Sequence, residues 1–181
     1  YRGLRTQEAE TFGHEGFGEV VEVGKSVRKI KVGDYVGSHW HPAYGDYYKM
    51  PETLAFKVPD KTHPWVLQPV ASVINAVNHL TPDDKKKKIL ILGSGFMAVL
   101  FHRLLPQADT VGAHNAEYFK NLRSEYSDTP AIVIEASGRR FAQAIRLVKP
   151  EGKVIVYANP EGGADGDTMF LASWNCLTLD F

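Results

Sequence analysis

The spacing of apolar and polar residues changes about one third of the way along the chain. Before residue 60, strand candidates at 19–23 and 35–36, and further short ones within 47–58, are separated by turn residues such as Gly24-Lys25-Ser26. Short strands at such close spacing favour a small β barrel or sandwich. The first third of the chain is therefore predicted to be β-rich.

The pattern becomes helical after Pro69. Apolar residues recur at helical spacing from Val70 to Leu80, with Pro69 in the first turn and Pro82-Asp83 after the end. Four lysines, 85–88, then precede the next apolar run. Short charge runs usually form a solvated surface, and phosphate binding is the alternative interpretation.

Strands and helices alternate over the rest of the chain. Ile89–Leu92 is uniformly apolar, as expected of a strand covered on both faces in a parallel sheet. Further strands are predicted at 110–113, 131–134, 153–157 and 176–181, with helices at 96–105, 118–126 and 141–148. This order predicts a doubly wound α/β sheet, although the segment between 113 and 131 has room for one helix and hardly for another strand.

Composition narrows the class of protein. The 181 residues carry 21 Lys+Arg and 21 Asp+Glu, so charge gives no reason to expect nucleic acid or a membrane surface as partner. The longest uncharged apolar stretch, 89–101, is too short to span a bilayer, which needs about 20 apolar residues. The single cysteine excludes an internal disulfide framework. No cleavable apolar leader precedes the domain, so a cytoplasmic location is expected. A start at Tyr1 and an end at Phe181 suggest a piece of a longer protein.

A glycine-rich turn follows the buried strand. Gly93, Gly95 and Ala98 match the dinucleotide fingerprint G-x-G-x-x-G/A between a strand and a helix. The first glycine permits the tight turn, the second lets the backbone approach a pyrophosphate, and the small Ala98 permits close helix packing. The candidate pyrophosphate-binding residues are Gly93, Gly95, Phe96, Met97 and Ala98. An ordinary glycine-rich turn is the alternative.

The residue that would contact the ribose is not acidic. At the end of the second strand, where a carboxylate selects NAD, this chain has His114. The nearest basic residues are Lys120 and Arg123. The sequence therefore leaves both NAD and NADP open as cofactor.

A second motif lies near the start. Gly13-His14-Glu15 is followed by glycines and a valine at the spacing G-H-E-x2-G-x5-G-x2-V. This spacing resembles the zinc-containing alcohol dehydrogenases of the medium-chain dehydrogenase/reductase superfamily. The resemblance continues in order through Gly33-Asp34, 51–60, 68–71, the Gly93 turn, 135–138 and 150–152.

The resemblance implies a fold. It implies an α/β protein with a partial GroES-like β-rich N-terminal domain at 1–66, a linking helix at 67–84 and a partial Rossmann domain, a doubly wound parallel sheet, at 85–181.

The resemblance also implies residue roles. His14 would be a zinc ligand, Glu15 an accessory ligand or outer partner, and zinc would polarise a carbonyl or lower the pKa of a bound alcohol. Ala136, Ser137 and Gly138 would line the cofactor cleft.

The metal set departs from the family pattern. The family's first ligand, a cysteine, would lie upstream of Tyr1, and Gln68 replaces a glutamate ligand. Gln68 is thus a weak candidate for the metal pocket. His39 and His41 form an H-x-H pair that could hold a metal, but a polar surface loop is favoured.

The leading hypothesis is an NAD(P)-dependent oxidoreductase that transfers hydride to or from a secondary alcohol, polyol or ketone. The alternatives are a degenerate relative that at most binds nucleotide, and a zinc-free enzyme similar to quinone reductases. A small-molecule alcohol or ketone is the expected partner, and the resemblance makes a homo-oligomer the first expectation.

Overall fold

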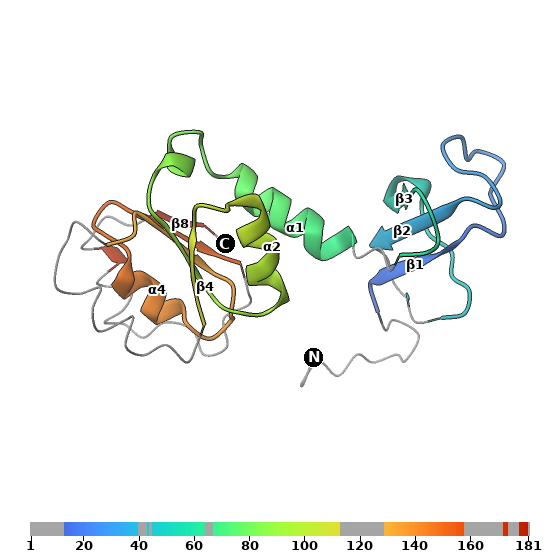
Figure 1. Cartoon of the computed structure of the whole chain (residues 1–181). Helices are drawn as coiled ribbons and strands as arrows, with labels where there is room; N and C mark the ends of the chain where they lie inside the picture. The colour runs from blue at the N-terminus through green and yellow to red at the C-terminus, as the bar shows by residue number, and fades with distance from the viewer. Residues whose placement is uncertain are drawn as a thin grey trace. The chain divides into compact units, whose positions relative to one another are not determined.

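The computed structural model describes residues 13–39, 43, 45–63, 67–112, 129–157, 172–173 and 178–180. The chain divides into two compact units, Tyr1–Ala71 and Ser72–Phe181, and each is described by itself (Figure 1).

The first unit contains a three-stranded antiparallel sheet. Its strands are β1 (Glu15–Glu19), β2 (Tyr35–His39) and β3 (Ala55–Lys57), in the order β1-β2-β3. The prediction of a strand over 19–23 is wrong, because β1 ends at Glu19 and Val21 is 59% exposed. The true strand was not predicted because it contains glycines. A Cβ on Gly16 would lie 2.0 Å from the Tyr48 hydroxyl oxygen, so close packing requires glycine there.

Carboxylates organise the loops of this sheet. Asp34 accepts hydrogen bonds from Lys57 Nζ at 2.9 Å and from the Lys31 amide at 2.9 Å, and the Lys57 bond chiefly lowers the pKa of Asp34. Glu52, in the 3₁₀ helix η2 (Glu52–Leu54), accepts the amides of residues 28–30. Polar contacts therefore fix these turns.

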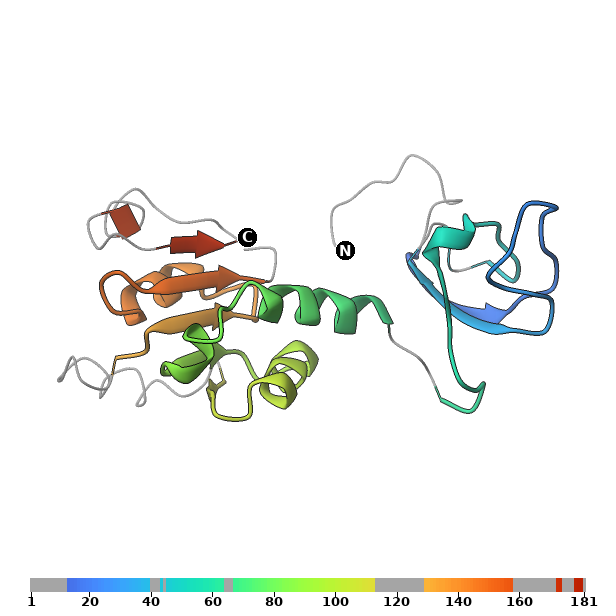
Figure 2. The ribbon, with the colours of Figure 1, turned by 90° about the horizontal axis from the view of Figure 1, so that it is seen from above.

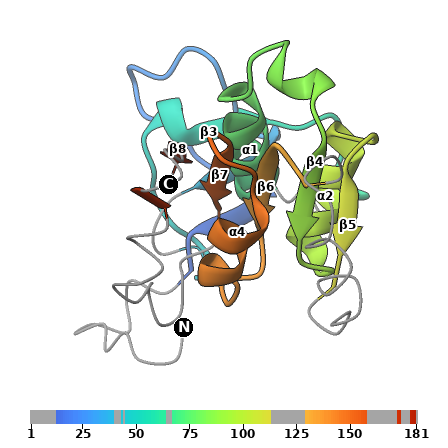
Figure 3. The ribbon, with the colours of Figure 1, turned by 90° about the vertical axis from the view of Figure 1, so that its left-hand side faces the viewer.

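The second unit is built on a five-stranded parallel sheet. The strands are β4 (Ile89–Leu92), β5 (Asp109–Val111), β6 (Ile132–Glu135), β7 (Lys153–Val156) and β8 (Thr178–Asp180). Their order is β5-β4-β6-β7-β8 (Figure 3). Residues 113–128, where the sequence leaves hardly any room for a further strand, lie outside the described residues. The predicted helix at 118–126 lies outside the described residues.

Helices cover both faces of this sheet (Figures 1 and 2). Ile89 and Ile91 pack with α1 (Leu67–Asn78) and α2 (Phe96–Leu104), whereas Leu90 and Leu92 pack with α4 (Phe141–Leu147). Burial of each such side chain contributes about 1.5–3 kcal/mol. The apolar run at 89–92 is thus buried on both sides, and the predicted α/β fold class is confirmed. No helix in the described part of the chain could span a membrane.

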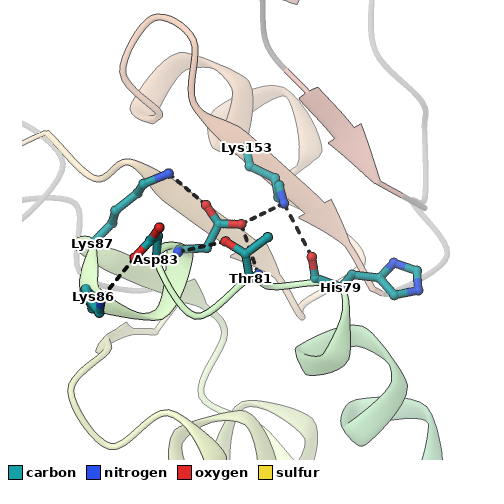
Figure 4. Close-up of polar contacts among 7 residues, drawn as sticks. His79, Thr81, Asp83, Lys86, Lys87 and Lys153 are labelled. Carbon is teal, nitrogen blue, oxygen red and sulfur yellow. Dashed lines mark hydrogen bonds and ion pairs between the residues drawn. The ribbon is translucent and has the colours of Figure 1, made fainter.

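A buried carboxylate ties the loop before β4 to β7. Asp84, which is 7% exposed, accepts hydrogen bonds from Lys87 Nζ at 2.7 Å, Lys153 Nζ at 3.0 Å and the Thr81 amide at 3.2 Å. Figure 4 shows Lys87 and Lys153 reaching toward one carboxylate. Beside them, at the amino ends of β6, β7 and β8, lies a cavity of about 500 Å³. Apart from these contacts, Lys86–Lys88 are exposed, as expected of a charge run that forms a solvated surface.

Candidate functional site

Three loops meet at the carboxyl ends of β5, β4 and β6. Gly112 follows β5, Gly93 to Gly95 follow β4, and Ala136 to Gly138 follow β6. A Cβ on Gly112 would lie 3.1 Å from Ser94 Oγ, and a Cβ on Gly93 would lie 3.4 Å from the Ala136 carbonyl carbon. The chain leaves β4 toward β5 on one side, while β6 pairs on the other, so the loops flank a topological switch point. Ligands of open α/β sheets bind at such points.

The two glycines after β4 have different reasons to be glycine. Gly93 has φ 143°, which side chains rarely adopt, and its amide donates to the Val111 carbonyl at 2.9 Å. Gly95 has φ −83°, and a Cβ added there would meet nothing within 4 Å. Neither backbone conformation nor protein packing requires glycine at position 95. The open space beside Gly95 is where the motif would let a pyrophosphate approach the backbone.

The start of α2 is suited to bind an anion. Gly95 is its N-cap residue and provides no side-chain cap, and the Val99 amide donates to the Gly95 carbonyl at 3.2 Å. The amides of the first turn, at Phe96 and Met97, have no carbonyl partner within a helix, and the helix dipole favours negative charge there. Ala98 is 1% exposed and packs in the core, so a small residue permits the close packing expected at this position.

The loop after β6 is held by a buried glutamate. Glu135 has no exposed surface, and its Oε1 accepts the Ser137 amide at 2.9 Å and the Ser137 hydroxyl. Its Oε2 accepts the Gly138 amide at 3.0 Å, and Gly138 has φ 73°. The strand was predicted from the sequence to end at Ile134, and no role was predicted for Glu135. The signal that could have revealed it is a glutamate directly after an apolar run and two residues before Ser-Gly.

The predicted metal residues lie in the first unit. His14 precedes β1, and its Nε2 lies 3.8 Å from Glu15 Oε1. Gln68 is the second residue of α1, and its neighbour Leu67 packs on Gly37 of β2, where a Cβ would lie 2.4 Å from Leu67 Cδ1. The described residues contain no group of three or more His, Cys, Asp or Glu side chains that could hold a metal ion. The metal roles of His14, Glu15 and Gln68 therefore stay predictions.

Several candidate residues fall where the structure gives no description. His114, expected near the ribose, lies outside the described residues, as do Lys120, Arg123 and His41. His39 ends β2 and pairs with Glu15 in the β1–β2 register.

Known proteins share both parts of this architecture. Residues 2–60 match the alcohol dehydrogenase GroES-like domain family. The chain is 27% identical over 157 residues to the (R,R)-butanediol dehydrogenase of Bacillus subtilis (strain 168), covering 70% of this chain and 44% of that protein. It is 24% identical over 163 residues to an L-threonine 3-dehydrogenase of Caldanaerobacter subterraneus subsp. tengcongensis, covering 71% of this chain and 46% of that protein.

A solved structure shows the same fold. The quinone oxidoreductase of Escherichia coli complexed with NADPH matches with a TM-score of 0.71 at 16% identity, over 97% of this chain and 64% of that one. The chain spans about half the length of the curated relatives that it matches.

Together, the antiparallel sheet and the parallel sheet define a GroES-like domain followed by a partial Rossmann domain. The resemblance of the chain to the medium-chain dehydrogenases is confirmed.

Proposed function

We propose that this protein is an oxidoreductase that uses NAD or NADP and binds it at the carboxyl ends of β4 and β6. The observation that carries the proposal is Gly95, a glycine that borders open space at an uncapped helix start. The relatives support it, since those found by sequence are named dehydrogenases and the matched quinone oxidoreductase is complexed with NADPH.

Each residue of the site has a role in this proposal. The backbone from Gly93 to Ala98 binds the pyrophosphate, with the amides of the α2 first turn as donors. Ala136, Ser137 and Gly138 line the adjoining part of the cleft, and the place of His114 in the sequence makes it the candidate ribose residue. When bound, the nicotinamide supplies the hydride acceptor or donor.

The second substrate is a secondary alcohol, polyol or ketone. This class follows from the names of the relatives and the Gly13-His14-Glu15 motif. On the basis of this motif, His14 and Glu15 are also proposed to act at a zinc site, and Gln68 to face the metal pocket. A catalytic zinc takes three protein ligands, and the described residues contain no group of three His, Cys, Asp or Glu side chains that could hold one.

Fluorescence titration with NADH and NADPH tests the proposal. Saturable binding of either, with hydride transfer to or from an alcohol or ketone, is the expected result. Comparing the two ligands also decides between NAD and NADP. Absence of binding by both, in folded protein, would contradict the proposed function. Metal analysis of the same sample, with His14→Ala beside the parent chain, tests the zinc role separately.

A further inference from the structure

We propose that Glu135 is a positioning residue that sets the shape of the β6 loop for the nicotinamide half of the cofactor. The inference rests on the proposed function and adds a residue to it. Glu135 does not face the ligand in this account. It acts through the backbone of Ser137 and Gly138.

The side-chain hydrogen bonds of Glu135 are made within its own loop. Both carboxylate oxygens accept hydrogen bonds, Oε1 from the amide and hydroxyl of Ser137 and Oε2 from the amide of Gly138. The Ser137 hydroxyl oxygen in turn accepts the Arg139 amide at 3.2 Å. One side chain therefore orders three consecutive residues, Ser137 to Arg139, between β6 and α4.

Because the Glu135 carboxylate is buried, it requires hydrogen-bond donors around it. Glu135 is fully buried, and a buried carboxylate is stable only where hydrogen-bond donors replace the lost water. All three partners are donors, which matches a carboxylate with two accepting oxygens. Glutamine has the same shape but one accepting oxygen. The side-chain NH2 group of glutamine would face a hydrogen-bond donor of the loop. At least one backbone amide of the loop would therefore lose its acceptor.

The place of the loop in the sheet indicates which half of the ligand depends on it. A dinucleotide lies across the switch point, with one mononucleotide on each half of the sheet. The half that contains β4 and β5 carries the fingerprint and the adenosine, whereas β6 begins the other half. The Glu135 loop still touches the fingerprint, because a Cβ on Gly93 would lie 3.4 Å from Ala136. Disordering this loop should weaken contacts of the nicotinamide half and leave the adenosine half in place.

The experiment compares Glu135→Gln with the parent chain for two ligands, NADH and 5′-AMP, which carries the adenosine half alone. We expect the Kd for NADH to rise about tenfold, and the Kd for AMP to stay within about twofold. Ser137→Ala, which removes the hydroxyl's bonds to Glu135 and to the Arg139 amide but keeps both loop amides on Glu135, should raise the Kd for NADH by about threefold. Glu151→Gln is the matched control, since Glu151 is exposed beside the cavity at the amino ends of the strands, and it should change neither Kd.

The outcomes distinguish failure of the positioning role of Glu135 from failure of the proposed function. An equal loss of both ligands in Glu135→Gln would show a general defect of the fold and overturn the positioning role. Unchanged NADH binding in Glu135→Gln would overturn it as well. If Glu135→Gln does not fold, unchanged NADH binding in Ser137→Ala is the contradicting result. If the parent chain binds neither ligand, the proposed function fails.

Discussion

The two ends of the parallel sheet are built by opposite principles. At the amino end, a buried carboxylate, Asp84, is bound by Lys87 and Lys153, so this carboxylate has its charged partners within the protein. At the carboxyl end, Gly95 borders open space and α2 begins without a side-chain cap. The same strands therefore support one end that is complete by itself and one whose polar groups suit a ligand.

This difference separates stability from binding. Substitutions at the amino end should change the free energy of unfolding and leave nucleotide affinity alone. Substitutions beside Gly95 should do the reverse. A polar cluster is therefore not a ligand site merely because it is charged: the lysines at residues 87 and 153 are bound to Asp84, although they border a cavity.

The largest expected effect is loss of binding in Gly95→Asp. The new carboxylate would occupy the space proposed for the pyrophosphate, and repulsion should raise the Kd for NADH at least about 100-fold. Because aspartate is a favoured N-cap residue, the melting temperature should hold or rise slightly. Gly24→Asp adds the same charge in an exposed turn and should leave the Kd unchanged. Tight NADH binding by Gly95→Asp would place the ligand elsewhere.

At the other end, Asp84→Asn should destabilise the protein by about 2 kcal/mol, because two ammonium groups and the Thr81 amide lose a charged acceptor. Urea denaturation followed by circular dichroism measures the loss. The Kd for NADH should stay within about twofold. A change in the Kd as large as that in Gly95→Asp would remove the separation between the two ends.

Acid should weaken the same cluster. The hydrogen bond from Lys87, followed by those from Lys153 and Thr81, holds the pKa of Asp84 well below its usual 3.8. The unfolded chain therefore takes up the proton at higher pH than the folded protein does. The stabilisation by Asp84 is complete above about pH 5 and is lost as the pH falls through the usual pKa toward the lowered one. The stability difference between the parent chain and Asp84→Asn should shrink between about pH 5 and 2, and a constant difference would contradict this linkage.

The smallest effect is expected at Lys87. Its side chain is 48% exposed, against 22% for Lys153, which also donates to the His79 carbonyl at 3.4 Å. Although the Lys87 bond is the chief cause of the lowered pKa of Asp84, solvent screens an exposed ion pair, so Lys87→Ala should cost about 0.5 kcal/mol and Lys153→Ala about twice as much. Thermal unfolding of the two variants provides the comparison, and the reverse order would mean that exposure does not decide the strength of these pairs.

The parallel sheet was readable from sequence because its strands are covered on both faces. Uniform apolar runs such as Ile89–Leu92 and Val154–Val156 are typical of strands buried on both faces, and both form strands. The β1 strand was not readable, since it carries Gly16 and Gly18 while the more apolar Val20–Val23 follows it. Packing of Tyr48 against Gly16 fixes that strand, and such a contact is distant in sequence.

The site was readable only in part. The Gly93–Ala98 turn could be predicted because each position of the motif has a backbone or packing reason, and the structure shows those reasons at Gly93 and Ala98. Glu135 could not, because a charged residue after a strand is ordinarily exposed, and its burial depends on donors from Ser137 and Gly138. Likewise, the pairing of Lys153 with Asp84 requires residues 69 positions apart to meet.

The central claim is that the carboxyl ends of β4 and β6 bind a nicotinamide dinucleotide. Amide NMR spectra recorded during a titration with NADH test it most directly. The account predicts shifts at residues 93–98 and 136–138, with the amides of Asp84, Lys87 and Lys153 unchanged. Shifts confined to the amino end, or spectra that do not respond to NADH or NADPH, would contradict it.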